Sequence, residues 1–285
     1  MSTDPSLALS RPGCRSGRPP ENVHAFTLIE LLVVIALIAI LASLLLPAAA
    51  KGKVTVQSIA CENNFKQLQF AWQLYTVDSH EDLPRNRWMA INWSDGCPSG
   101  YQTTSDSWVL GDATVDTQTW NIRNGSLFPY SGSTRIYHCP TDRSVVDLRR
   151  QVIRTRSYSM SYYMNGSEGK PERKTNLSQL AAPSRAFVFI EENENSIGDG
   201  VFFVHVPADA GEWAEAQTNP AFGGAHWMDA PADRHRQGCN LSFADGHEEH
   251  WPWKWPKRVD PNNPDVVNQL DFQDMRRLQA AIPAR

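Results

Sequence analysis

The longest apolar run of the chain lies near its N-terminus. From Leu31 to Ala50 no residue is charged, and only Ser43 and Pro47 fall outside the apolar set. A helix rises about 1.5 Å per residue, so this run is long enough to cross a hydrocarbon core of about 30 Å. One carboxylate, Glu30, stands directly before it, where a charge is costly and usually has a function. The pattern therefore predicts one membrane-spanning helix.

An amphipathic helix is expected to follow the apolar run. Apolar residues recur there at steps of four and three, which is the spacing of a single helical stripe. They are Cys61, Phe65, Leu68, Trp72 and Tyr75. We therefore expect one long helix over residues 26–77, bent at Pro47, with a second half that packs against a sheet.

Short strands are expected in the rest of the chain. The segments with strand character are residues 107–110, 120–122, 157–164, 185–190 and 199–206. A hairpin is predicted over residues 240–251, with a tight turn at Asp245-Gly246, and a short amphipathic helix over residues 266–282. A long polar loop, residues 207–238, precedes the hairpin. These elements predict an α+β fold in which the N-terminal helix packs on an antiparallel β-sheet with irregular insertions.

Size and charge limit the classes of function. The chain has 285 residues, which leaves enough sequence for one substantial domain after the apolar run. Its formal net charge is −4. It shows no basic patch, which argues against nucleic acid as a partner. The first 25 residues are rich in Pro, Ser and Gly and are expected to be disordered. Their slight excess of arginine favours a cytoplasmic N-terminus, so the globular part would face outward.

Residues 25–35, Ala-Phe-Thr-Leu-Ile-Glu-Leu-Leu-Val-Val-Ile, resemble the processing site of type IV prepilins and type II secretion pseudopilins. The resemblance implies that a prepilin peptidase cuts between Ala25 and Phe26 and methylates the new amine of Phe26. Glu30 matches the glutamate of that family, and Pro47 matches its helix-kinking proline. The family usually has glycine before the cut, where this chain has Ala25.

The resemblance also implies an organisation for the whole chain. Residues 1–25 would be a cleaved leader, 26–50 a transmembrane and filament-core helix, and 51–285 a pilin-like globular domain. The protein would cross the inner membrane once, with its globular domain in the periplasm, and would enter an envelope filament. Its partners would be the prepilin peptidase, other pilin-like subunits, the assembly platform and the membrane. It would be the substrate of an enzyme and not itself an enzyme.

Charge pairing gives Glu30 a physical role in such a filament. A buried unpaired carboxylate is strongly unfavourable, and the free amine of Phe26 on a neighbouring subunit could pair with it after cleavage. Three other interpretations stay open from the residues alone. Glu30 could be an interfacial glutamate with no partner, the run could be a plain membrane anchor, or a signal peptidase could cut near Ala50.

A second resemblance covers three further motifs. Residues 61–68, Cys-Glu-Asn-Asn-Phe-Lys-Gln-Leu, and residues 139–142, Cys-Pro-Thr-Asp, are similar to segments of a group of prepilin-type proteins found in planctomycete-like bacteria. His235 lies ten residues before Asp245-Gly246, as in the H-x9-DG domain of that group. This domain would occupy residues 235–246. From the residues, we expect His235 to hydrogen-bond into the hairpin region as a structural motif with Asp245 and Gly246.

Five cysteines are present, of which Cys14 lies in the leader. The other four are Cys61, Cys97, Cys139 and Cys239. In an outward-facing domain these four could form disulfides in three pairings, and buried free thiols are the other interpretation. Their wide spacing, without Cys-x-x-Cys, argues against a thiolate zinc site.

Histidines and acidic residues gather near the C-terminal part of the chain. The set comprises His226, His235, His247, His250, Asp229, Asp245, Glu248 and Glu249. Imidazoles with a carboxylate can hold zinc, and acidic loops can hold calcium. The spacing matches no zinc-protease pattern, so no metal and no other cofactor is expected.

Tryptophan is abundant, with ten residues in the chain. Trp251, Trp253 and Trp255 alternate with other residues, which would place three indoles on one face of an extended segment. That face could bind polysaccharide or close the edge of the sheet. No Gly-x-Ser-x-Gly and no phosphate loop occurs. The sequence thus favours a pseudopilin-like subunit over a membrane-anchored polysaccharide-binding module or a membrane-anchored metal hydrolase.

Overall fold

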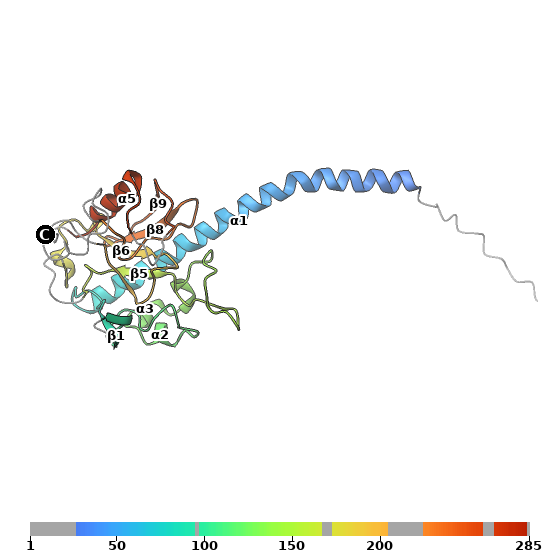
Figure 1. Ribbon diagram of the computed structural model, residues 1–285. Coiled ribbons are helices and arrows are strands. Elements are labelled where there is room, and N and C mark those ends of the chain that lie inside the picture. The colour runs from blue at the N-terminus through green and yellow to red at the C-terminus, as the bar shows by residue number, and fades with distance from the viewer. Residues whose placement is uncertain (1–26, 95–96, 167–172, 205–224, 259–264, 284–285) are drawn as a thin grey trace, which may run out of the picture. The chain divides into compact units, whose positions relative to one another are not determined.

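The computed structural model describes residues 27–94, 97–166, 173–204, 225–258 and 265–283 (Figure 1). The chain divides into two compact units, Met1–Ala50 and Lys51–Arg285. The expected leader, residues 1–25, and the expected cleavage bond lie outside the described residues, as does most of the expected loop between residues 207 and 238.

The N-terminal helix, α1, spans Leu28–Asp78 and contains Pro47. It agrees closely with the helix predicted from the sequence. The predicted apolar stripe of its second half is buried, fully at Cys61, Phe65, Leu68 and Trp72 and partly at Tyr75. A polar residue beside the stripe, Gln69, is buried as well, because its Oε1 accepts a hydrogen bond from Ser242 Oγ at 2.8 Å. This bond fastens the helix to the sheet.

A five-stranded sheet forms the centre of the second unit. Its strand order is β7 (Val201–Phe202), β5 (Tyr158–Ser161), β6 (Phe187–Glu191), β8 (Gly238–Phe243) and β9 (Glu248–Pro252). The pairs β5–β6, β6–β8 and β8–β9 are antiparallel, whereas β7 pairs with β5 in parallel. The predicted antiparallel sheet is confirmed over β5, β6, β8 and β9, and β7 adds one parallel pairing at its edge. After β6 the chain crosses over β5, and β7 pairs with the edge of β5 that faces away from β6. Because β7 runs opposite to β6, it runs parallel to β5.

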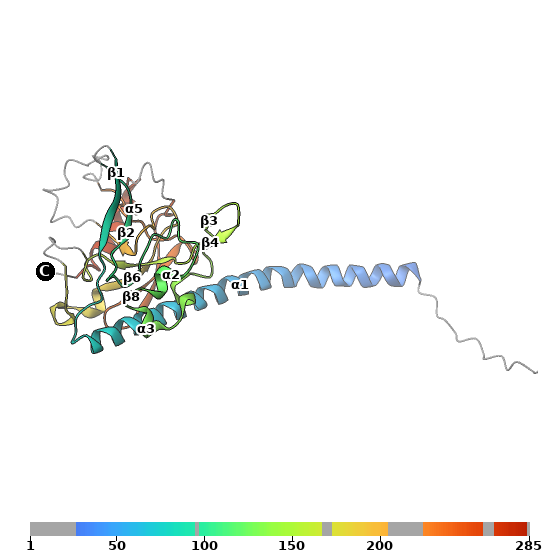
Figure 2. The same cartoon turned by 90° about the horizontal axis from the view of Figure 1, so that it is seen from below.

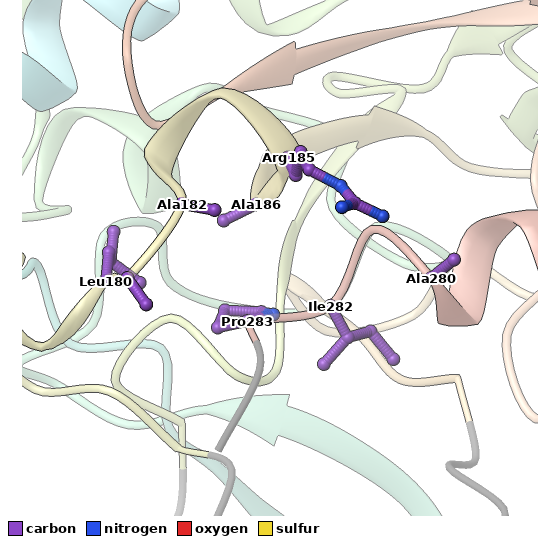
Figure 3. A pocket seen from close by; sticks show the side chains of 8 residues that line it. Leu180, Ala182, Arg185, Ala186, Ala280, Ile282 and Pro283 are labelled. Atoms are coloured by element: carbon purple, nitrogen blue, oxygen red, sulfur yellow. The ribbon is translucent and has the colours of Figure 1, made fainter.

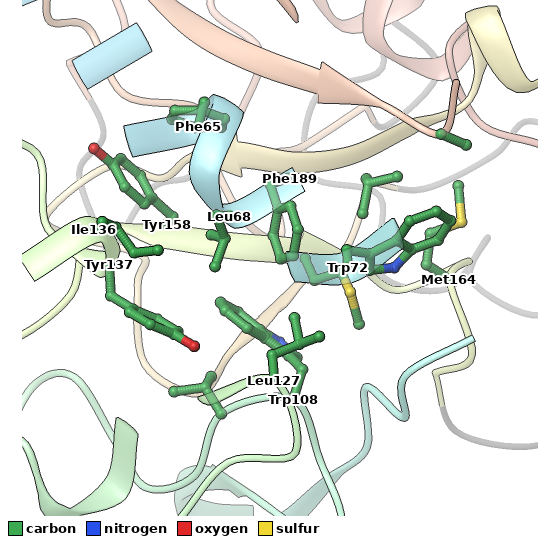
Figure 4. Close-up of a cluster of buried hydrophobic side chains, with 14 of the residues drawn as sticks. Phe65, Leu68, Trp72, Trp108, Leu127, Ile136, Tyr137, Tyr158, Met164 and Phe189 are labelled. Carbon is green, nitrogen blue, oxygen red and sulfur yellow. The ribbon is translucent and has the colours of Figure 1, made fainter. Parts of the chain in front are cut away.

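Apolar clusters cover both faces of the sheet. On one face, Leu68 and Trp72 of α1 pack with Tyr158, Phe189 and Trp108 (Figure 4). On the other face, side chains of β8 and β9 pack against the C-terminal helix α5, which spans Gln269–Gln279 and confirms the predicted terminal helix. The sheet thus lies between the second half of α1 and α5 (Figure 2). Strands β5, β6, β7 and β8 are buried along their whole length because both faces are covered there, whereas the edge strand β9 keeps most of its residues at the surface.

Short elements fill the region between α1 and β5. They are β1 (Trp88–Ser94), β2 (Cys97–Thr103), α2 (Trp120–Arg123), α3 (Phe128–Ser131), η1 (Thr134–Tyr137), β3 (Val145–Asp147) and β4 (Val152–Ile153). Two further 3-10 turns, η2 (Leu177–Gln179) and η3 (Pro183–Arg185), precede β6. The pairs β1–β2 and β3–β4 form separate two-stranded sheets.

Two predicted strands in this region are wrong. Residues 120–122 lie in helix α2, and residues 107–110 form no strand beyond a single bridge of Ser107 to Arg85. The apolar character of the second segment has another cause. Trp108 is fully buried in the core, where its Nε1 donates hydrogen bonds to Asn86 Oδ1 and Gly200 O. A loop that supplies one large core side chain resembles a strand in local composition.

The predicted hairpin is confirmed as β8 and β9, which pair from Gly238 with Pro252 to Ser242 with Glu248. Its turn places Gly246 at φ +102°, and the Gly246 N–H donates to Phe243 O at 2.9 Å. A positive φ is unstrained only for glycine. A Cβ at this position would also lie 2.6 Å from Gln73 Nε2 of α1.

We expect Gly246→Val to lower the free energy of unfolding by about 1–3 kcal/mol, because a β-branched residue resists positive φ. Thermal unfolding of the detergent-solubilised chain, followed by tryptophan fluorescence, measures the change. Gly198→Val is the matched control, since φ there is not positive and a Cβ would have Asp112 Oδ1 as its nearest contact at 3.9 Å. Equal stability of the two variants would contradict the role of this turn.

Candidate functional site

The N-terminus of α1 carries a capping box made by Thr27 and Glu30. Glu30 Oε2 accepts hydrogen bonds from Thr27 N at 2.9 Å and from Thr27 Oγ1 at 2.7 Å. In return, Glu30 N donates to Thr27 Oγ1 at 3.3 Å. Such reciprocal bonds satisfy backbone donors that the first helical turn leaves unpaired. The sequence signal is Thr-x-x-Glu before an apolar run, and it gives Glu30 a role within its own helix that the resemblance does not include.

The helix that follows is suited to a membrane. Leu28–Pro47 is long and apolar enough to cross a bilayer, and its residues are not buried within the chain. Leu28 is 80% exposed and Leu46 is 70% exposed. A surface of this kind is unfavourable in water and requires lipid or apolar neighbours. The segment therefore anchors the chain in a membrane.

His235 lies in the second unit and is buried beside the core. Its Nε2 contacts Glu191 Oε1 at 3.0 Å and Cys139 Sγ at 3.3 Å, and its Nδ1 has no hydrogen-bond partner among the described residues. The predicted hydrogen bond from His235 into the hairpin region is therefore wrong. The imidazole points toward β6 and the turn at residues 139–142, while Asp245 and Gly246 stay at the tip of the hairpin.

A buried cluster of four side chains results: Cys61 from α1, Cys139 from the 139–142 turn, Glu191 from β6, and His235. One ligand-type atom from each residue lies within 4.8 Å of all the others, and all four residues are buried. Cys61 Sγ donates to Glu191 Oε1 at 3.0 Å and contacts Tyr158 Oη at 3.2 Å. Three motifs that the sequence analysis identified separately, residues 61–68, residues 139–142 and His235, thus meet at this cluster.

Electrostatics within the cluster favour an imidazolium beside anions. Burial alone would lower the pKa of His235, but hydrogen bonds to Cys139 and Glu191 raise it to about 10. Burial opposes ionisation of Cys139, yet hydrogen bonds to Cys61 and His235 lower its pKa to about 7. The pKa of Glu191 is lowered by His235 in spite of burial, and burial raises the pKa of Cys61 well above its usual value. Glu191 and Cys139 therefore stabilise the imidazolium form of His235.

The backbone that carries His235 is strained. His235, Arg236 and Gln237 have φ values of +52°, +67° and +59°, which makes three successive left-handed residues without a glycine. Each such residue costs about 1–3 kcal/mol, so the surrounding structure must hold the segment in place. Arg234 does so through an ion pair with Asp142 at 3.2 Å, which also ties the segment to the 139–142 turn.

Cys61, Cys139 and Cys239 are buried free thiols in the structure. This arrangement corresponds to the free-thiol interpretation for these three residues. Cys14 and the side chain of Cys97 lie outside what the structure describes, so any disulfide that involves them stays a prediction.

The other three histidines of the predicted set do not join the cluster. His247 Nδ1 pairs with Asp245 Oδ1 at 2.5 Å at the hairpin tip, and His250 Nδ1 contacts Asn240 Oδ1 at 3.1 Å. His226 Nε2 contacts Met228 Sδ at 3.3 Å. Among the described residues, the group of Cys61, Cys139, Glu191 and His235 is the one that could hold a metal ion. From the sequence, His235 was a candidate zinc ligand, the cysteine spacing argued against thiolate ligands, and nothing pointed to Glu191, because no local spacing links these residues.

Of the two uses expected for the alternating indoles, closing the edge of the sheet is the one that Trp251 and Trp253 show. Trp251 and Trp253 are about 5% and 4% exposed, and only Trp255 reaches solvent appreciably. Trp253 Nε1 donates to Ala232 O at 2.8 Å, and the guanidinium of Arg277 lies 3.9 Å from the Trp251 ring centroid. The first two indoles therefore close the edge of the sheet against α5 and offer no stacking platform for sugars.

A small pocket opens near the C-terminal end of α5 (Figure 3). Its volume is about 150 Å³. It is lined by Leu180, Ala181, Ala182, Arg185, Ala186, Ala280, Ile282 and Pro283. Arg185 is the one charged residue of this lining, and none of the lining residues is a nucleophile or a general base. The pocket therefore offers no catalytic chemistry.

Comparison with known proteins identifies one matching family model. The prokaryotic N-terminal methylation motif matches residues 22–46, which include the expected cleavage site, the capping box and most of the apolar segment. No significant match was found among curated proteins or solved structures. Together with the apolar helix, the motif supports a type IV pilin-like protein, a substrate of prepilin peptidase and a structural subunit.

Proposed function

We propose that this chain is a pseudopilin-like subunit that works in the bacterial cell envelope. A prepilin peptidase removes residues 1–25 and methylates the amine of Phe26. The mature chain then assembles with other pilin-like subunits, on an assembly platform, as part of a type II secretion or type IV pilus-like machine. Its single helix crosses the inner membrane, and its globular unit lies in the periplasm.

The main support for this proposal is that the methylation motif and the membrane-length helix overlap in one segment. The methylation motif over residues 22–46 overlaps a helix that is capped at Thr27 and exposes leucine and isoleucine along Leu28–Pro47. A helix of this kind can leave the bilayer only if another apolar surface replaces the lipid. Bundling with the same helix of neighbouring subunits supplies that surface.

The globular unit supports a structural role. The second half of α1 is fastened to the sheet by a buried apolar stripe and by the bond between Gln69 and Ser242. This part of α1 is therefore held in the core of the second unit. Such a connection suits a subunit that is moved out of the membrane by an assembly machine.

We expect cleavage between Ala25 and Phe26, followed by N-methylation. Intact-mass and peptide mass spectrometry of the chain, purified from cells that contain a prepilin peptidase, should show methyl-Phe26 as the first residue. Ala25→Gly should keep or increase cleavage, because the peptidase then meets the smallest possible residue. Ala50→Leu is the control, since it blocks a signal-peptidase cut near this position and should leave the product unchanged.

Two outcomes would contradict the proposal. A mature chain that begins at Lys51 would show a cleaved signal peptide. An uncut Met1 in the presence of an active peptidase would leave a plain membrane anchor.

A further inference from the structure

The geometry points to a structural zinc site formed by Cys61, Cys139, Glu191 and His235. This inference concerns only the second unit and does not depend on how the N-terminus is processed. It goes beyond the assembly function, because it assigns a bound cation to the interior of the subunit.

Distances within the cluster suit a tetrahedral ion. Zinc binds sulfur at about 2.3 Å and nitrogen or oxygen at about 2.0–2.2 Å, which places tetrahedral ligand atoms about 3.3–3.8 Å apart. The four ligand atoms here lie within 4.8 Å of one another. Glu191 Oε1 is 3.0 Å from both Cys61 Sγ and His235 Nε2, and Cys139 Sγ is 3.3 Å from His235 Nε2. Shifts of about 1 Å or less would bring every atom to a zinc distance.

The donor set selects among metals. Two thiolates and an imidazole favour zinc or another soft to borderline ion, whereas calcium and magnesium require oxygen ligands. Iron–sulfur clusters are held by four cysteines or, in Rieske centres, by two cysteines and two histidines, whereas this site offers two cysteines, one histidine and one glutamate. Four protein ligands and full burial leave no open position for a substrate, so the site is of the closed, structural kind and not a hydrolase centre.

Surrounding groups hold the ligands in place. Asn240 N of β8 donates to Glu191 Oε2 at 2.8 Å, which leaves Oε1 for the ion. Thr141 Oγ1 contacts Cys139 Sγ at 2.9 Å, and Tyr158 Oη contacts Cys61 Sγ at 3.2 Å. Such outer contacts orient metal ligands and raise affinity.

The strained backbone gives an independent reason to expect a ligand. Three successive left-handed residues, His235 to Gln237, turn the imidazole inward, and the ion pair between Arg234 and Asp142 holds this turn against the segment that carries Cys139. Strain of this kind persists where a functional constraint maintains it. An ion that joins α1, β6 and two loops would be such a constraint, and its binding would favour the folded chain.

Metal content of the detergent-purified full-length chain tests the inference. Cells are grown with added zinc, purification avoids chelators, and elemental mass spectrometry should find about one zinc per chain. Cys139→Ser and His235→Ala should lower the zinc content by about tenfold or more. Cys239→Ser and His250→Ala are the matched controls, since Cys239 is a buried thiol and His250 an exposed imidazole, both outside the cluster, and both variants should retain zinc.

A second measurement guards against variants that fold poorly. The wild-type chain is stripped with a chelator and titrated with Co²⁺, which should produce a thiolate-to-cobalt charge-transfer band and the visible bands of tetrahedral cobalt. Stripping should also lower the unfolding temperature of the wild type and of Cys239→Ser, and zinc should restore it.

Three results would overturn the inference. The first is a wild-type chain without stoichiometric metal that also shows no cobalt bands. The second is zinc that remains in both Cys139→Ser and His235→Ala. The third is a disulfide between Cys61 and Cys139 in peptide maps of the non-reduced chain, which would show that the two thiols pair with each other.

Discussion

Arg156→Met is expected to lower the free energy of unfolding by about 3–5 kcal/mol, because it removes a fully buried cation that the fold surrounds with acceptors. Arg156 Nη1 donates to Leu110 O at 2.6 Å. Its Nη2 donates to Gly111 O at 3.2 Å, Gly198 O at 2.6 Å and Asp199 O at 2.8 Å. Methionine keeps much of the volume but leaves these carbonyls without their donor.

The loss should be larger at pH 7 than at pH 5. Burial raises the pKa of Asp199 to about 6, and the nearby charge of Arg156 keeps it from rising further. A carboxyl with a raised folded pKa stabilises the protein fully below its unfolded pKa, and this contribution is lost as pH rises through the folded value. Without Arg156 the folded pKa of Asp199 rises further. The variant therefore loses more stability than the wild type between these two pH values.

Denaturant unfolding of the detergent-solubilised chain at both pH values measures this effect. Arg150→Met is the matched control, because the Arg150 side chain is 81% exposed and surface changes stay within about 0.5 kcal/mol. If Arg156→Met unfolded at the same denaturant concentration as this control, the buried guanidinium would have no role in holding the region between α1 and β5.

Glu30→Leu is expected to be inserted into the membrane and cleaved, yet to assemble poorly. If the carboxylate pairs with the amine of Phe26 on a neighbouring subunit inside an apolar core, loss of one partner removes about 3–5 kcal/mol from that contact. The fraction of cleaved chain that sediments with filaments, or that forms ladders after cross-linking, measures assembly.

Two further variants separate charge pairing from helix capping. Thr27→Ala removes the capping hydroxyl but keeps the carboxylate, so it should assemble. Glu30→Gln keeps a side chain that can accept from Thr27 N but has no charge, so it should fail as Glu30→Leu does. Failure of Thr27→Ala together with normal assembly of Glu30→Gln would reverse the interpretation, and Glu30 would then act only as a helix cap.

Local patterns in the sequence were enough for the elements that depend on local rules. An uncharged apolar run and a stripe at helical spacing determined α1, and the alternation around Asp245-Gly246 determined the β8–β9 hairpin and the positive φ of Gly246. These features follow from helix period, strand period and turn geometry, each of which acts over a few residues. The methylation motif is one continuous segment, so its resemblance to prepilin processing sites can be recognised without knowledge of the tertiary structure.

Other outcomes depended on contacts between distant segments. The burial of Trp108 gave a loop the composition of a strand, and the burial of Trp251 and Trp253 decided that these indoles close the edge of the sheet. In both cases the tryptophan itself indicated burial, but the neighbouring sequence did not indicate which surface would cover it. The sequence gives the apolar side chain, whereas tertiary packing decides which surface covers that side chain.

What the sequence by itself determined is a membrane-length helix with a processing motif, a hairpin and a terminal helix. Only the tertiary structure decided where the chemistry lies. Cys61 and Glu191 are separated by 130 positions in the chain, and Cys139 and His235 by 96, yet their side chains meet in one buried cluster. No short spacing predicts such a meeting, because it depends on how α1 lies on the sheet, on the register of β6 and β8, and on a left-handed turn at residues 235–237.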